Sequence, residues 1–138
     1  MKQIFSAALL LAFIFTLISC GNAQQTDVWE KATYRQDTEL GEGSKTVTVE
    51  VSAQGQTVVF TVKTERDKLG AALQELGLLQ GEDSSYGLYV KKVNGIMADY
   101  DVDQSYWALY IDGEYAMTGV DSTDITEGVT YRLAYKKG

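Results

Sequence analysis

The stretch that most constrains the fold is Tyr100–Met117, which reads YDVDQSYWALYIDGEYAM. In its centre, Ser105–Ile111, apolar or aromatic side chains occupy both alternating faces. A strand of this kind is usually covered on both faces, so we expect it in the interior of a sheet. Asp112-Gly113 follows directly, and this dipeptide predicts a two-residue hairpin turn that brings residues 114–117 back alongside. The two expected faces are Tyr106, Ala108 and Tyr110 on one side and Trp107, Leu109 and Ile111 on the other.

The first twenty residues have the pattern of a bacterial lipoprotein signal. Lys2 supplies the positive start, and residues 7–18 are almost unbroken apolar. The run ends in LISCG (residues 17–21), which resembles a lipobox, where the cysteine becomes the acylated first residue of the mature protein. We therefore expect a signal peptide over residues 1–19. Lipid on Cys20 would hold the protein on the extracytoplasmic face of a cell membrane. An ordinary secretion signal with a chance cysteine is the alternative.

The balance of charge excludes some partners. The chain has 12 basic and 19 acidic residues and a net charge of -7. Nucleic-acid binding needs stripes of Lys and Arg, so we expect no nucleic-acid partner. Cys20 is the only cysteine, so the fold must be held by packing without disulfides.

Periodicity divides the rest of the chain into a tether and one domain. Residues 21–44 are polar and aperiodic, and we expect a flexible tether over residues 20–44, with local docking of Val28, Trp29 and Tyr34 as an alternative. From residue 45 to residue 138 the pattern is dense enough for one small domain.

The domain combines strands with one helix. Residues 46–51 and 58–63 alternate around Gln54-Gly55, which predicts a hairpin with one wet face. Leucines and alanine at helical spacing over residues 69–76 predict a helix. Further strands are expected at 86–93, at 105–111 and at 129–136, with a loop at 81–85. This order favours an α+β fold, a β-grasp-like mixed sheet with one helix packed on one face and the last strand beside the first. An all-β sandwich would leave the helical periodicity unexplained.

The chemistry-bearing residues argue against an enzyme. The sequence has no histidine and no second cysteine, so neither a Ser-His nor a Cys-His nucleophile can be assembled. Asp99, Asp101 and Asp103 alternate as in the first half of a Ca²⁺-binding loop, although Gln104 stands where that loop needs glycine. The sequence leaves a Ca²⁺ site or a solvated acidic loop as the two readings of this segment.

Aromatic residues are the remaining candidates for function. Eight of the nine tyrosines lie from Tyr86 onward. Tyr and Trp offer rigid contact area with a polar group, which suits flat rings, sugars or a protein partner. The alternative is that tyrosine simply fills strands, for which it has a high propensity.

Three segments carry a family resemblance. They are YGLYV (86–90), VNGI (93–96) and SYWALYIDGE (105–114), followed by Gly119-Val120 and Glu127-Gly128. Together they resemble a family of secreted bacterial domains of unknown function that is similar to the C-terminal domain of transcobalamin and intrinsic factor. The resemblance covers about residues 45–137. It implies a β-grasp-like fold, a non-catalytic module and cobalamin or a related corrinoid as the model ligand.

The sequence therefore predicts a membrane-anchored extracytoplasmic binding module that captures a small flat ligand such as a corrinoid. A protein-interaction or surface-assembly module of the cell envelope is the alternative. The ligand hypothesis requires that Trp107 be reachable rather than buried under the helix. The predicted contact residues are Tyr106, Trp107, Tyr110, Asp112, Gly113, Glu114 and Tyr115.

Overall fold

The computed structural model of the chain describes residues 27–138. The predicted signal peptide and the predicted lipid anchor at Cys20 lie outside the described residues. Among residues 27–138, no helix is long and apolar enough to cross a membrane.

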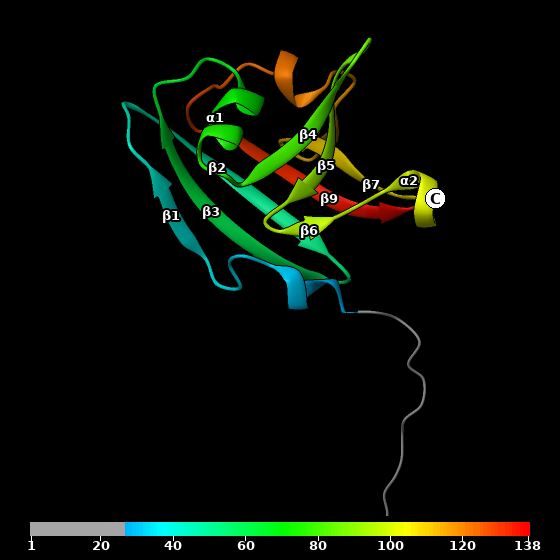
Figure 1. Cartoon of the computed structure of the whole chain (residues 1–138). Helices are drawn as coiled ribbons and strands as arrows, with labels where there is room; N and C mark the ends of the chain where they lie inside the picture. The colour runs from blue at the N-terminus through cyan, green and yellow to red at the C-terminus, as the bar shows by residue number, and fades with distance from the viewer. Residues whose placement is uncertain (1–26) are drawn as a thin grey trace, which may run out of the picture.

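The larger of two sheets has six strands in the order β1-β3-β2-β9-β7-β8 (Figure 1). The pairs β1/β3 and β2/β9 are parallel, and the other pairs are antiparallel. The sheet is therefore mixed, and its last strand lies beside the first strand of the long hairpin, as the sequence predicts. Its strands are β1 (Thr38–Gly41), β2 (Lys45–Ala53), β3 (Gln56–Thr64), β7 (Ser105–Ile111), β8 (Glu114–Tyr115) and β9 (Thr130–Lys137).

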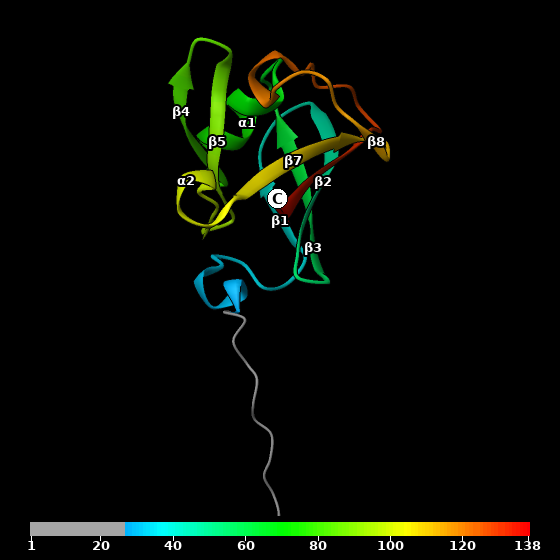
Figure 2. The ribbon, with the colours of Figure 1, turned by 90° about the vertical axis from the view of Figure 1, so that its right-hand side faces the viewer.

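A second layer covers one face of this sheet (Figures 1 and 2). It consists of helix α1 (Leu69–Glu75) and a three-stranded sheet in the order β4-β5-β6. The expected class, a mixed sheet with a helix on one face, is confirmed, but the second sheet was not expected. Its strands are β4 (Leu79–Ser84), β5 (Gly87–Val93) and β6 (Ile96–Met97), and the short helices are η1 (Val28–Lys31), α2 (Tyr100–Asp103) and η2 (Val120–Ser122).

The core lies between the two layers. Alternate residues of β2, β3, β7 and β9 point into it, and the residues between them remain half-buried or exposed on the outer face. Burying one face of a strand requires this period of two. Its largest fully buried side chains include Tyr131, Phe60, Leu69, Leu73, Leu78, Leu79, Ile96 and Leu133.

Three tight turns follow the local chemistry of the sequence. Gln54-Gly55, Asn94-Gly95 and Asp112-Gly113 have positive φ at both residues: 49° and 81°, 51° and 82°, and 48° and 88°. Turns of this kind match the twist of the flanking strands, and glycine adopts positive φ without strain. Both predicted hairpins are present, and Asn94-Gly95 forms a third turn, between β5 and β6.

Two predictions about strands are wrong. β7 does lie inside the large sheet, between β9 and two-residue β8, as predicted, but within residues 27–138 no second layer covers its outer face, contrary to the prediction. Tyr106 and Tyr110 are half-buried on that face, because tyrosine can keep its ring on the sheet and its hydroxyl in water. The segment expected as a loop, 81–85, instead forms most of β4, which pairs along β5.

The N-terminal segment differs from the predicted flexible tether over 20–44. Residues 28–41 form η1 and β1, and β1 pairs with β3. Trp29 is buried, and its indole Nε1 donates a hydrogen bond of 2.9 Å to the carbonyl of Ala53. The docking considered as the alternative therefore occurs, because Trp29 and Tyr34 complete the core beside the hairpin end.

Asn94 fastens this segment to the domain. It is fully buried, and its side chain contacts the backbone of Tyr34 twice: Nδ2 donates to the carbonyl at 2.8 Å, and Oδ1 accepts from the amide at 2.9 Å. The amide of Thr33 also donates to the Asn94 carbonyl at 2.9 Å. A turn residue thus pairs with a segment 60 positions earlier in the chain.

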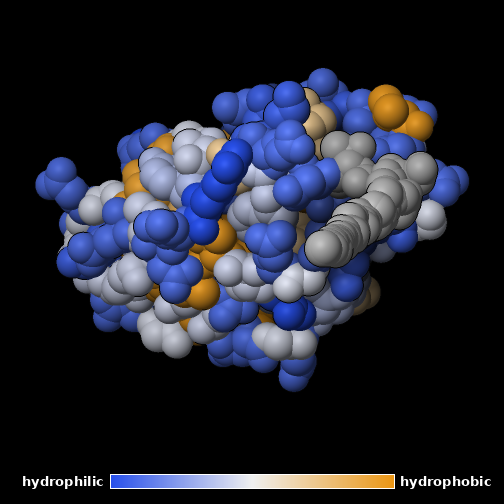
Figure 3. Space-filling model, turned by 90° about the horizontal axis from the view of Figure 1, so that it is seen from below, coloured by the Kyte–Doolittle hydropathy of each residue, from blue (hydrophilic) through white to orange (hydrophobic). Residues whose placement is uncertain are grey.

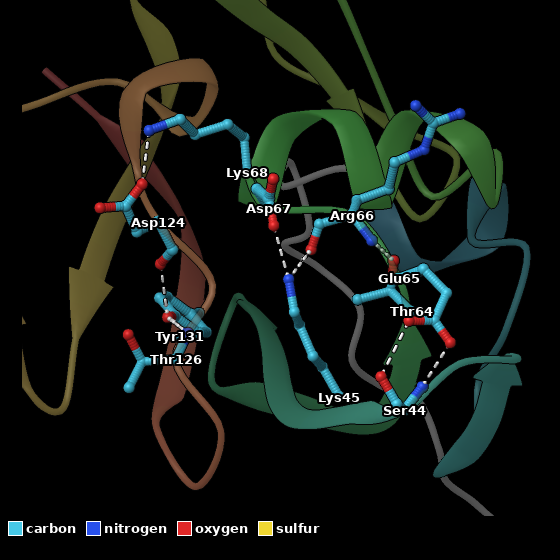
Figure 4. Close-up of polar contacts among 10 residues, drawn as sticks. All are labelled: Ser44, Lys45, Thr64, Glu65, Arg66, Asp67, Lys68, Asp124, Thr126 and Tyr131. Carbon is cyan, nitrogen blue, oxygen red and sulfur yellow. Dashed lines mark hydrogen bonds and ion pairs between the residues drawn. The ribbon is translucent and has the colours of Figure 1, made fainter.

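Polar contacts join the loops at the other end of the sheet (Figure 4). Ser44 donates from its amide and hydroxyl to the Glu65 carboxylate at 2.9 and 2.8 Å, and Lys45 pairs with Asp67 at 2.7 Å. The buried Tyr131 donates from its hydroxyl to the carbonyl of Asp124 at 2.8 Å. These contacts hold the start of α1 and the loop before β9 against the sheet.

Candidate functional site

A groove opens at the side of the molecule where β5 faces β7. Figure 2 shows the positions of these two strands. Its volume is about 260 Å³. The amide of Leu88 donates to a carboxylate oxygen of Asp121 at 3.1 Å, which ties β5 to η2 at one end of the groove. The segment after β8 closes another side, where the amide of Ala116 donates to the Leu109 carbonyl at 2.9 Å. The lining consists of residues 88–90, 107–109, 115–120 and Leu133.

The groove has an apolar wall and an exposed rim. Leu88 and Val90 are half-buried and pack against the core, whereas Met117 is 89% exposed and Tyr89 is 38% exposed. Exposed methionine and tyrosine at the edge of a groove are typical of binding surfaces, because methionine is adaptable and tyrosine is amphipathic.

Trp107 lies at the bottom of this groove. It is 9% exposed, its indole Nε1 donates to the carbonyl of Ile96 at 3.3 Å, and its ring meets Tyr135 edge-on at 5.6 Å. The side chain is therefore a core residue that also lines the groove. A ligand in the groove would reach only a small part of the indole.

The other predicted aromatic contact residues lie on the opposite side of the sheet from Trp107. Tyr106, Tyr110 and Tyr115 belong to the outer face, where the Tyr110 and Tyr115 rings meet edge-on at 5.7 Å. Because Trp107 points the opposite way, it does not form one cluster with these tyrosines. Tyr115, at the strand end, also lines the groove.

The predicted hairpin residues lie at the end of β7. Asp112 accepts the amide of Thr130 on Oδ1 at 3.0 Å and donates its own amide to the Thr130 carbonyl at 2.8 Å, so it extends the pairing with β9. Gly113 and Glu114 are exposed. Asp112 thus has a structural contact, and the turn stands beside the tyrosine cluster rather than within the groove.

Two cations accompany the outer-face tyrosines. The guanidinium carbon of Arg132 lies 4.6 Å from the centroid of the Tyr110 ring, and Lys136 Nζ lies 5.6 Å from it. Sequence reasoning missed these residues as site candidates. The period-two alternation of the last strand places both on the outer face, but only the pairing of β9 with β7 brings them to Tyr110.

Two of the three aspartates proposed for Ca²⁺, Asp99 and Asp103, use their carboxylates in other contacts. Asp99 caps α2 by accepting the amide of Asp101 at 3.0 Å, and Lys91 lies 3.7 Å from its other oxygen. Asp103 accepts from the hydroxyl and the amide of Ser105, and these hydrogen bonds, with Lys137 nearby, lower the pKa of the Asp103 carboxyl. Within residues 27–138, no group of three His, Cys, Asp or Glu side chains is arranged to hold a metal ion.

The groove residues Tyr89 and Met117 carried no usable signal in the sequence. Tyr89 belongs to a strand that reads as an ordinary alternating segment, and Met117 follows a turn. They meet only because the small sheet packs next to the edge of the large one, which is a non-local arrangement.

Comparisons with known proteins agree with this architecture. No curated protein matches the chain. Among solved structures, a candidate metal-binding protein from Ruminococcus gnavus ATCC 29149 matches with 32% identity and a TM-score of 0.65, over 69% of this chain and 99% of that protein. Haptocorrin in complex with Cbi matches with 20% identity and a TM-score of 0.58, over 71% of this chain and 26% of haptocorrin. The chain thus spans about a quarter of haptocorrin, and that similarity concerns the fold.

The family assignment rests on the C-terminal half. Residues 67–137, from two residues before α1 to the end of β9, match the family described as Domain of unknown function (DUF4430). The predicted resemblance to the transcobalamin C-terminal domain is supported by the haptocorrin match. The chain belongs to the DUF4430 family.

Proposed function

We propose that the protein is a non-catalytic binding module that holds a small flat ligand, such as a corrinoid, in the groove between β5 and β7. The observation that carries this proposal is the groove with Trp107 at its bottom, Leu88 and Val90 on one wall, and the exposed Tyr89 and Met117 at its rim. The parallel pairing of β2 with β9 supports a β-grasp-like description of the fold. The similarity to haptocorrin, whose structure holds Cbi, supports the choice of ligand class.

The size of the groove limits how much of the ligand it contacts. Pockets that bury most of a drug-sized ligand have volumes of roughly 300–1,000 Å³, and this groove has about 260 Å³. A corrinoid is larger than a drug-sized molecule, so the groove would contact one edge of the ring system. Binding of this kind is weaker than in an enclosing site and suits capture and release.

The position of the groove supports display at a surface. η1, where the described chain begins, lies at one end of the molecule, and η2 and the tip of the β4–β5 hairpin lie at the opposite end (Figure 1). Seen from the η1 end, the surface is mostly hydrophilic, with apolar residues in small separate patches (Figure 3). In our proposal, lipid on Cys20 anchors the protein to the extracytoplasmic face of a membrane and leaves the groove end facing outward. Release of the Cys20→Ala protein into the medium, with loss of the lipid mass, would test the anchor.

Calorimetric titration of the full chain in detergent with cobinamide and cobalamin tests the ligand. We expect saturable heat that weakens about fivefold in Met117→Ala, because Met117 is a rim contact. Met97→Ala is the matched control, since Met97 is 52% exposed but does not line the groove. A repeat with Ca²⁺ shows whether a metal contributes. No heat at millimolar ligand, or equal weakening in both variants, would contradict the proposal.

One observation favours the second candidate, a protein-interaction module of the cell envelope. Tyr86, at the tip of the β4–β5 hairpin, is 98% exposed, and Met117 is 89% exposed near the same end of the molecule. Large exposed aromatic and sulfur-containing side chains commonly anchor protein partners. If corrinoids give no heat, cross-linking in whole cells through Tyr86 replaced by a photoreactive residue would test this candidate.

A further inference from the structure

The outer face of the large sheet has a second hollow, separate from the groove. It has a volume of about 290 Å³ and lies over the hairpin end of β2 and β3 and the last residues of β9. The groove is built on the other side of the sheet edge, from β5 and the segment after β8. The hollow is lined by residues 52–57, Arg132, Ala134, Tyr135 and Lys136.

Its positive charge comes from Arg132 and Lys136. Both line the hollow, and both cationic groups approach the ring of Tyr110, at 4.6 and 5.6 Å from its centroid. Two like charges that converge on one ring repel each other, and an anion between them would relieve this repulsion. Contact with the Tyr110 ring also limits where the guanidinium group can lie.

Neither cation is neutralised by a carboxylate. In the part of the chain that the structure describes, six other lysines and arginines form ion pairs with Asp or Glu, but Arg132 and Lys136 form none. Glu50 is the carboxylate beside Arg132 in the strand register, and it is not within ion-pair distance. In a chain with a net charge of -7, this leaves a local positive site on an otherwise acidic molecule.

The floor of the hollow offers hydroxyls beside a small apolar surface. The strand register places Thr57, Ser52 and Ala134 in one row across β3, β2 and β9, all on the outer face. Ser52 and Thr57 can each donate and accept a hydrogen bond, and Ala134, which is 5% exposed, lines the hollow beside them. The hollow thus combines two cations, two hydroxyls and one apolar contact.

We propose that this hollow binds one anionic sugar, a hexuronate or a phosphorylated hexose. The acidic group lies between the guanidinium of Arg132 and the ammonium of Lys136, which donate charge-assisted hydrogen bonds to it. The sugar hydroxyls contact Ser52 and Thr57, and the apolar face of the ring lies on Ala134. The volume of about 290 Å³ suits one such unit.

The test is a titration of the ¹⁵N-labelled full chain in detergent, followed by amide chemical shifts. The probes are galacturonate, galactose 6-phosphate, neutral galactose and inorganic phosphate. We expect saturable shifts at Ser52, Arg132 and Ala134 with an acidic sugar, and binding of galactose at least about tenfold weaker. The two acidic sugars compared with each other distinguish a carboxylate from a phosphate ligand.

Charge variants on the same face sharpen the test. Arg132→Gln and Lys136→Gln should each weaken binding about tenfold, and Glu50→Gln should strengthen it, because it removes the nearby negative charge. Lys63→Gln is the matched control, since Lys63 lies on the outer face of β3 but pairs with Glu39 at 3.3 Å. The affinity of the Lys63→Gln variant for the acidic sugar should equal that of the wild type.

Three results would overturn the proposal: equal shifts with galactose, unchanged affinity in Arg132→Gln, or inorganic phosphate binding as tightly as either acidic sugar. The last would show an unspecific anion site. The heat of corrinoid binding is a separate measurement, because Arg132 does not line the groove. Arg132→Gln should leave that heat unchanged, so failure at the hollow is distinguishable from failure of the function proposed for the groove.

Discussion

Replacing Asn94 by aspartate tests how the N-terminal segment is held. The change keeps the shape of the side chain and tolerates positive φ, but it exchanges the Nδ2 donor for an oxygen. That oxygen would face the carbonyl of Tyr34 at the present 2.8 Å contact, inside a site that is fully buried. Leaving a buried carbonyl without its donor costs about 1–3 kcal/mol, and a charged carboxylate adds to this cost.

The cost has a ceiling set by protonation. A protonated carboxyl can donate to Tyr34 and restore both contacts, and holding the proton costs about 1.36 kcal/mol for each pH unit above an unfolded pKa of about 3.9. The loss at pH 7 therefore cannot exceed about 4 kcal/mol, and we expect about 2–4 kcal/mol. Burial raises the folded pKa of the introduced carboxyl, so the loss grows as pH rises above 3.9 and shrinks as pH falls. At pH 5 the ceiling is about 1.5 kcal/mol.

Urea unfolding of the full chain at pH 7 and pH 5 measures both values. Gln80→Glu is the control for the added charge, because Gln80 is exposed on β4. Asn94→Asp with wild-type stability at pH 7, or with a deficit that increases at pH 5, would refute the assigned contacts.

Three further perturbations probe neighbouring contacts. Ser105→Ala removes the hydroxyl that donates to Asp103, so the lowered pKa of that carboxyl should rise toward its ordinary 3.8 in a carbon-detected NMR titration. The stabilisation from the lowered pKa is present above 3.8 and is lost as pH falls through the folded value, so the variant should lose less stability on acidification. Gly95→Ala places a Cβ 2.5 Å from the carbonyl oxygen of Lys31, at a residue whose φ is +82°. This variant should lower the free energy of unfolding by roughly 2 kcal/mol or more. An unchanged free energy of unfolding would mean that the turn is not held as described. Trp29→Phe leaves a buried carbonyl of β2 without its donor and should cost about 1–3 kcal/mol in the same unfolding assay, whereas no change would argue that water replaces the indole.

The sequence predicts correctly those helices and strands that depend on residues close together in the chain. The long hairpin follows from alternation around Gln54-Gly55, and α1 follows from its leucine spacing. β4 was missed because LQGEDS has no alternation, and its stability comes from pairing along β5. β1 was missed for a similar reason, since its partner in the sheet, β3, lies about twenty residues further along the chain.

The same difference between local pattern and long-range packing applies to the candidate site. Alternation within β7 placed Trp107 and Tyr110 on opposite faces, but it gave no sign of which face would be covered. The groove depends on the packing of β5 beside β7, and the hollow depends on the register of β9 against β2 and β7. Registers between strands that are far apart in sequence leave no local pattern, so Arg132 and Met117 were not candidates until the fold brought them into place.

The short outer strands have a consequence for self-association. The large sheet ends in the four-residue β1 and the two-residue β8, and Glu39 on β1 is paired with Lys63 on its neighbour. Short, charged edge strands are poor templates for edge-to-edge pairing with another molecule. Many copies crowded together should therefore remain separate particles, and we expect light scattering at high protein concentration to report monomers. Extending the β7–β8 hairpin by a few alternating apolar residues would remove this protection.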